Sequence, residues 1–60
     1  MIVNFYEIVG ICDYKFIISK YLTVLPPANT GIRISGNMFY INSIDFDVDK
    51  CEYSFYLYKM

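Results

Sequence analysis

Three aspartates at alternate positions are the residues of this chain whose spacing most resembles a set of metal ligands. Asp45, Asp47 and Asp49 match the first, third and fifth positions of an EF-hand calcium loop. That loop also requires Gly at its sixth position and a bidentate Glu at its twelfth, where this sequence has Lys50 and Tyr56. Because the lysine would compete with a bound cation, the sequence predicts no metal site.

The same segment is typical of a β-hairpin turn. We expect residues 47–50 to form the loop, with Asp45 and Glu52 close together on the solvent face of the two strands. Two facing carboxylates repel each other, which is the one unfavourable feature of this interpretation.

The sequence offers no recognisable catalytic set. It has no His, which removes Ser-His and Cys-His nucleophile systems. Cys12 and Cys51 are too far apart in sequence for a C-x-x-C motif, and two thiols without His make a poor zinc site. We therefore expect a protein that is not an enzyme and has no cofactor.

The two cysteines also bear on the compartment. Residues 1–10 lack the basic start of a secretory signal, and Glu7 interrupts their apolar run. This indicates a reducing cytoplasm, in which both thiols stay unbridged. We expect Cys12 to lie in a loop and Cys51 to point inward from the last strand.

Composition limits the chain to one small domain, residues 1–60, in which 57% of the residues are apolar. A chain of this length buries only about 60% of its unfolded surface, so either much apolar surface stays exposed or another chain covers it. Five basic residues against six acidic ones form no basic stripe, which disfavours nucleic-acid binding. No apolar run reaches the ~20 residues of a membrane span.

Ile, Tyr and Phe are the most frequent residues of the sequence and favour strands over helices. Turn signals divide the chain into five segments. We expect an all-β fold, either a single five-stranded antiparallel sheet or a small barrel of the SH3 or OB type. The expected strands are residues 2–11, 16–25, 31–35, 38–46 and 51–59.

The first two segments are expected to pair as a hairpin with a loop at residues 12–15. This register places Glu7 opposite Lys20 and Tyr6 opposite Tyr21.

The alternative for the second segment is a helix over about residues 14–25, with Asp13 as its N-cap and Pro26 as its stop. β-Branched residues at Ile17 and Ile18 favour the strand.

The third and fourth segments form the clearest hairpin. Residues 36–37, Gly-Asn, suit a two-residue turn with positive φ, which would pair Ile34 with Phe39 and Ile32 with Ile41.

The fourth segment then changes its inward face. Apolar residues occupy odd positions before Asn42 and even positions after it, including Ile44 and Phe46. A strand with a period of two cannot do this without an extra residue, so we predict a β-bulge at Asn42-Ser43 that bends the strand.

The stretch "LPPANTGIRISGNMFYINSIDFDVDKCEYSFYLYK" has a Pro-containing loop, a short Ile-rich strand, a Gly turn, a long strand, an Asp-rich turn and a final strand. Over about residues 22–59 this pattern resembles small, functionally unassigned proteins of phages and mobile elements. Usual members have Gly-Asp before the short strand, whereas this chain has Thr30-Gly31. The resemblance implies a viral or mobile-element origin, and hence the host cytoplasm, but it carries over no active site.

With the expected register, one outward face gathers apolar and tyrosine side chains suited to an interface. The expected partner-binding residues are Tyr6, Ile8, Ile17, Tyr21, Tyr56 and Tyr58.

The outward tyrosine-bearing face and the missing catalytic set together predict a non-enzymatic protein-binding module, either a phage-encoded inhibitor of a host protein or a self-assembling domain. Two alternatives remain open. One is an oligomer that sequesters a small molecule or nucleotide, with Arg33 or Lys20 meeting phosphate, and the other is single-strand nucleic-acid binding on tyrosines.

Overall fold

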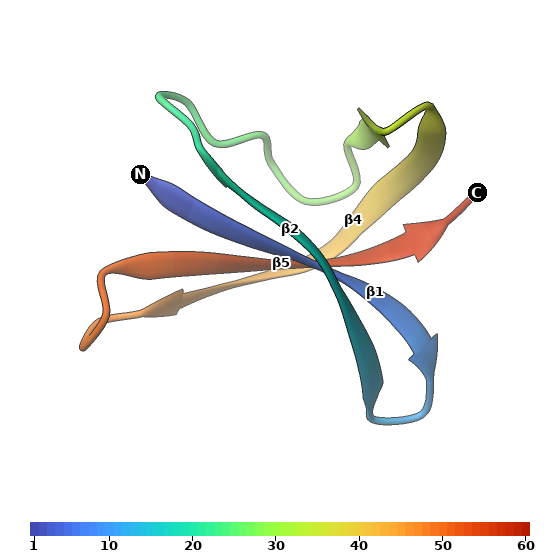
Figure 1. Cartoon of the computed structure of the whole chain (residues 1–60), viewed down its shortest axis with the longest axis horizontal. Coiled ribbons are helices and arrows are strands. Elements are labelled where there is room, and N and C mark those ends of the chain that lie inside the picture. The colour runs from blue at the N-terminus through green and yellow to red at the C-terminus, as the bar shows by residue number, and fades with distance from the viewer.

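Five strands and no helix make up the protein, as the sequence predicts (Figure 1). The computed structural model describes all residues, 1–60. Residues 14–25 do not form the alternative helix, because most of them belong to the second strand and the rest to a loop. The strands are β1 (Ile2–Gly10), β2 (Asp13–Tyr21), β3 (Gly31–Ile34), β4 (Asn37–Asp47) and β5 (Glu52–Lys59).

The strands form one mixed sheet in the order β2-β1-β5-β4-β3, curled into a half-barrel. The first and last strands pair in its centre, and they run parallel, with Val3 opposite Tyr53. The expectation of a wholly antiparallel sheet is therefore wrong at this one pair. A parallel pair needs a long crossover connection, which β2, residues 22–30, β3 and β4 provide here. The edges of the sheet are β2 and β3.

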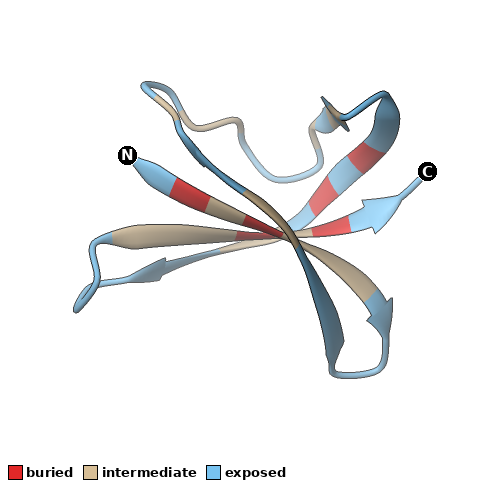
Figure 2. Cartoon of the chain, in the orientation of Figure 1, coloured by how far each residue is buried: buried red, intermediate tan, exposed pale blue.

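The core lies on the concave side of the three central strands (Figure 2). Phe5 and Phe55 meet edge to face there, with ring centroids 5.4 Å apart. Leu22 and Leu25, from the loop that joins the two edges, pack against this core. Only six residues are buried, so most of the apolar side chains keep some contact with solvent. The six are Val3, Phe5, Phe39, Ile41, Phe55 and Leu57.

The predicted bulge in β4 is confirmed. Ile41 pairs with Leu57 and Ser43 with Tyr56, which leaves Asn42 as the extra residue. Ile41 on one side of the bulge and Ile44 on the other consequently both face the core.

The turn between β3 and β4 lies one residue earlier than predicted. Ser35 and Gly36 occupy it, with φ values of 50° and 82°. Positive φ at both central residues defines a type I′ turn, whose twist suits a two-residue hairpin. Ile32 therefore pairs with Phe39, and the expected pair Ile32–Ile41 is wrong.

The β1–β2 hairpin also differs from the expected register. Its turn is formed by Ile11 and Cys12 instead of a loop over residues 12–15, and Cys12 has a φ of 62°. Two further bulges, one at Val9 in β1 and one at Ile17 in β2, change the pairing along the hairpin. Glu7 consequently lies opposite Lys15, not Lys20.

The acidic segment is a hairpin turn, as predicted, but the loop is residues 48–51. The Asp47 carboxylate accepts hydrogen bonds from the backbone N–H groups of Asp49 (3.0 Å) and Lys50 (3.2 Å), which fixes the turn. Glu52 lies opposite Asp47, and not beside Asp45 as expected.

Both cysteines lie in turns. Cys51 is exposed with a φ of 54°, so its expected inward position is wrong, because the shifted loop includes it. Cys12 and Cys51 are both free thiols, as predicted.

No helix in this fold could span a membrane.

Candidate functional site

Four aromatic rings from three adjacent strands pack together on the convex side of the sheet. Tyr6 stacks on Tyr56 with ring centroids 5.5 Å apart and meets Phe16 edge to face at 5.6 Å. Tyr14 lies against Tyr56 at 4.9 Å. We call Tyr6, Tyr14, Phe16 and Tyr56 the outer aromatic cluster.

Strand register produces this cluster. In the centre of the sheet Tyr6 lies directly opposite Tyr56 across the parallel β1–β5 pair. On its other side Tyr6 lies opposite Phe16. The bulge at Ile17 is what brings Phe16 to this face, because Ile18 on the other side of the bulge faces the core.

The cluster is open to solvent at its β2 edge. Tyr14 and Phe16 keep 56% and 54% of their surface exposed, whereas Tyr6 and Tyr56 are half-buried beneath them. Burial raises the pKa of the Tyr56 phenol above its ordinary value of 10.0, and the nearby Asp45 carboxylate raises it further. The Tyr56 hydroxyl therefore stays neutral and able to donate a hydrogen bond.

A polar chain of side chains crosses the same three strands next to the cluster. The Ser19 hydroxyl donates to the side-chain oxygen of Asn4 (Oδ1), and the side-chain Nδ2 of Asn4 donates to the Glu52 carboxylate at 2.8 Å. Asp45 lies opposite Ser54 and Asp47 opposite Glu52, so acidic residues collect at this end of the convex face. The convex face is thus aromatic at one end and acidic at the other.

The structure brings together four of the six predicted interface residues. Tyr6 and Tyr56 belong to the cluster, and Ile8 and Tyr58 lie beside it around a shallow hollow. Tyr58 also contacts Tyr40 at 5.4 Å.

The other two predicted residues lie elsewhere. Ile17 packs against the core at its bulge. Tyr21 lies opposite Ile2 at the far end of β2 and not opposite Tyr6. Sequence reasoning missed Tyr14 and Phe16. The available signal was the run Phe16-Ile17-Ile18, since three consecutive apolar residues break a period of two and indicate a bulge.

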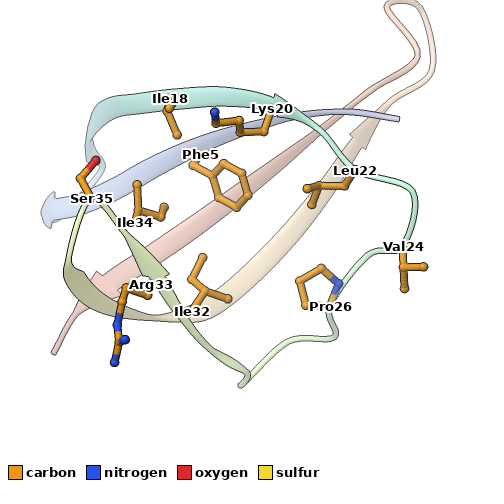
Figure 3. A pocket seen from close by; sticks show the side chains of 10 residues that line it. All are labelled: Phe5, Ile18, Lys20, Leu22, Val24, Pro26, Ile32, Arg33, Ile34 and Ser35. Carbon is orange, nitrogen blue, oxygen red and sulfur yellow. The ribbon is translucent and has the colours of Figure 1, made fainter.

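The concave side has a groove of about 530 Å³ between the two sheet edges (Figure 3). Ile18 and Lys20 from β2 form one wall, Ile32 and Ile34 from β3 form the opposite wall, and Phe5 forms the floor. The loop after β2 closes one end of the groove with Leu22, Val24 and Pro26.

The acidic residues do not form a candidate metal centre. No group of three or more His, Cys, Asp or Glu side chains lies close enough together to hold a metal ion. Asp47 is instead used by the backbone of its own turn. The candidate sites are therefore the convex face and the groove.

Comparison with known proteins adds no family to this description: no protein-family model, no curated protein and no solved structure matches the chain.

Proposed function

We propose that this protein is a non-enzymatic module that binds another protein through the convex face of its sheet. The observation that supports the proposal is the outer aromatic cluster, which remains half open to solvent in a chain with only six buried residues. Tyr and Phe are enriched in the cores of protein interfaces. Half-buried Ile8 and exposed Tyr58 extend the patch beyond what scattered surface residues would give.

Charge indicates the chemistry of the partner. Neither β1 nor β5 places a Lys or Arg on the convex face. Their residues on this face are Ile2, Asn4, Tyr6 and Ile8 from β1, and Glu52, Ser54, Tyr56 and Tyr58 from β5. A partner that presents arginine fits both ends of this face, because a guanidinium group stacks on aromatic rings and pairs with carboxylates.

A second copy of the chain fits less well. It would present the same face, and the β1 and β5 rows of that face have no cation to pair with Glu52. We therefore propose a different protein with a basic surface as the partner. The resemblance to phage and mobile-element proteins supports a host protein in this role, which the module would inhibit by covering its surface.

Variants of the exposed cluster residues test the proposal. Tyr14→Ser with Phe16→Ser removes the open half of the cluster without touching the six buried residues. Tyr21→Ser is the matched control, because Tyr21 is on the same strand, 74% exposed, and outside the cluster. Circular dichroism should first show that all three proteins keep the same β structure.

The three proteins then serve as baits in a host lysate at low and high salt. We expect one basic protein to be retained by wild type and by Tyr21→Ser, to be released by salt, and to be lost with the double variant. Truncating an anchoring aromatic residue commonly costs about 2 kcal/mol of binding free energy, or about thirtyfold in affinity. Equal capture by all three baits would contradict the proposal. A wild type that is dimeric by light scattering, with a monomeric double variant, would show that the occupant is a second copy.

A further inference from the structure

The groove on the concave side has the composition of a ligand site and is independent of the convex face. Its volume of about 530 Å³ is within the ~300–1,000 Å³ common for small-molecule pockets. Seven of its ten lining residues are apolar or proline, so its interior suits a hydrocarbon.

One cation lies along the wall of this apolar groove. Lys20 occupies the same inward row of β2 as Ile18, opposite the buried Val3. In Figure 3 its side chain runs along the wall above Phe5, whereas the side chain of Arg33 extends from the rim away from the groove. No Asp or Glu lines the groove, although the chain as a whole carries more acidic than basic residues. The local charge is therefore positive.

The lining also limits the polarity of the ligand. Apart from Lys20 and Arg33, Ser35 offers the only polar side chain. A nucleobase would leave its donors and acceptors without partners against the Ile18, Ile32 and Ile34 walls, which is unfavourable. A hydrocarbon body has no such groups to satisfy.

We infer that the groove between β2 and β3 binds an amphipathic anion, with its hydrocarbon chain over Phe5 and its single carboxylate or phosphate head at Lys20. The two edge strands supply the aliphatic walls, and the loop over residues 22–30 closes the end that receives the tail.

Decanoate and decyl phosphate, used below their micelle-forming concentrations, are the probes for this site. Isothermal titration gives the affinity, and ¹H–¹⁵N NMR shifts of backbone amides locate the ligand. We expect shifts at Phe5, Ile18 and Ile34, and not at Tyr14 or Phe16. Octanoate should bind about fifteenfold more weakly than decanoate, since it is two methylenes shorter and each buried methylene contributes about fourfold in affinity. Tighter binding of the carboxylate or of the phosphate identifies the preferred head.

Charge variants test the role of Lys20. Lys20→Gln should weaken decanoate binding about two- to fivefold, which is the range of an exposed ion pair. It should not weaken the binding of decyltrimethylammonium, which has the same chain and the opposite charge. Lys15→Gln is the matched control, because Lys15 is on the same strand but does not line the groove. It should leave decanoate affinity unchanged.

Several results would overturn the inference. The first is that neither anion binds at millimolar concentration. The second is equal affinity for decanoate and decyltrimethylammonium, and the third is a set of amide shifts confined to the convex face. A dimer in which β2 and β3 amides are protected from exchange would show that a strand of another chain fills the groove instead. The Tyr14→Ser, Phe16→Ser variant should bind decanoate normally, so failure of the proposed protein-binding function would not affect this result.

Discussion

Deleting Asn42 should leave the protein folded, because Asn42 is the extra residue of β4, without a partner on β5. In the deletion variant Ile41, Ser43 and Ile44 follow one another in the regular alternation of a strand. Ile41 and Ile44 then still face the core, opposite Leu57 and Phe55. The deletion therefore removes the local bend of β4 without turning either half of the strand outward.

The structure sets the size of this effect. The Asn42 side chain is exposed and no buried residue changes its face, so we expect a loss of about 1 kcal/mol, the common size of a single change. Turning the second half of β4 outward instead would expose Ile44 and Phe46, each about half-buried, at a cost of about 1.5–3 kcal/mol in total. Asp45 would then also take the place of Ile44, opposite the buried Phe55, and lose part of its hydration, which brings the cost to about 3 kcal/mol or more. A chain of 60 residues typically has an unfolding free energy of about 3–9 kcal/mol, so a loss of about 1 kcal/mol leaves it folded.

Urea unfolding followed by circular dichroism measures this loss, with Asn42→Ala as the control. The Asn42 side chain is exposed, so its replacement should change the unfolding free energy by no more than about 0.5 kcal/mol. A deletion variant that is about 3 kcal/mol or more less stable than Asn42→Ala would refute the argument, because it would show that half of β4 has turned outward.

Two smaller effects follow from the backbone and from Tyr56. Ser35→Asn should raise the unfolding free energy by about 0.5 kcal/mol, because Asn tolerates the φ of 50° in a type I′ turn better than Ser does. Ser35→Val is the β-branched control, and urea unfolding that finds it as stable as Ser35→Asn would contradict this prediction. Burial raises the pKa of the Tyr56 phenol, so above pH 10.0 the folded protein keeps a proton that the unfolded chain has released. The contribution of Tyr56 to the unfolding free energy is therefore complete below pH 10.0 and falls as the pH rises above that value. Tyr56→Phe should therefore lose less stability than wild type between about pH 9 and 11 in urea unfolding, and parallel pH profiles would show that the Tyr56 proton is not linked to folding.

The sequence predicted the strands well because their composition and turn residues leave few alternatives. The β4 bulge was predictable since polar Asn42 and Ser43 interrupt two apolar series of opposite phase. The β1–β2 register was not predicted correctly, because both faces of that hairpin carry Ile, Tyr or Phe. The alternation of residues then shows no difference in polarity between the inward and the outward face. The outer aromatic cluster depends on this register, so only its β1 and β5 members, Tyr6 and Tyr56, were identified from the sequence.

The central position of β5 has a consequence for how the chain folds during synthesis. Val3 pairs with Tyr53, fifty residues further along the chain, and β4 reaches β1 only through β5. At a translation rate of about 5–20 residues per second, the β1–β2 hairpin exists for seconds before its central partner has been made. During that interval Val3 and Phe5 have no core to enter, and Tyr6 has no Tyr56 to stack on. We therefore expect the nascent hairpin to expose apolar side chains, and the sheet to close only after residues 52–59 have left the ribosome.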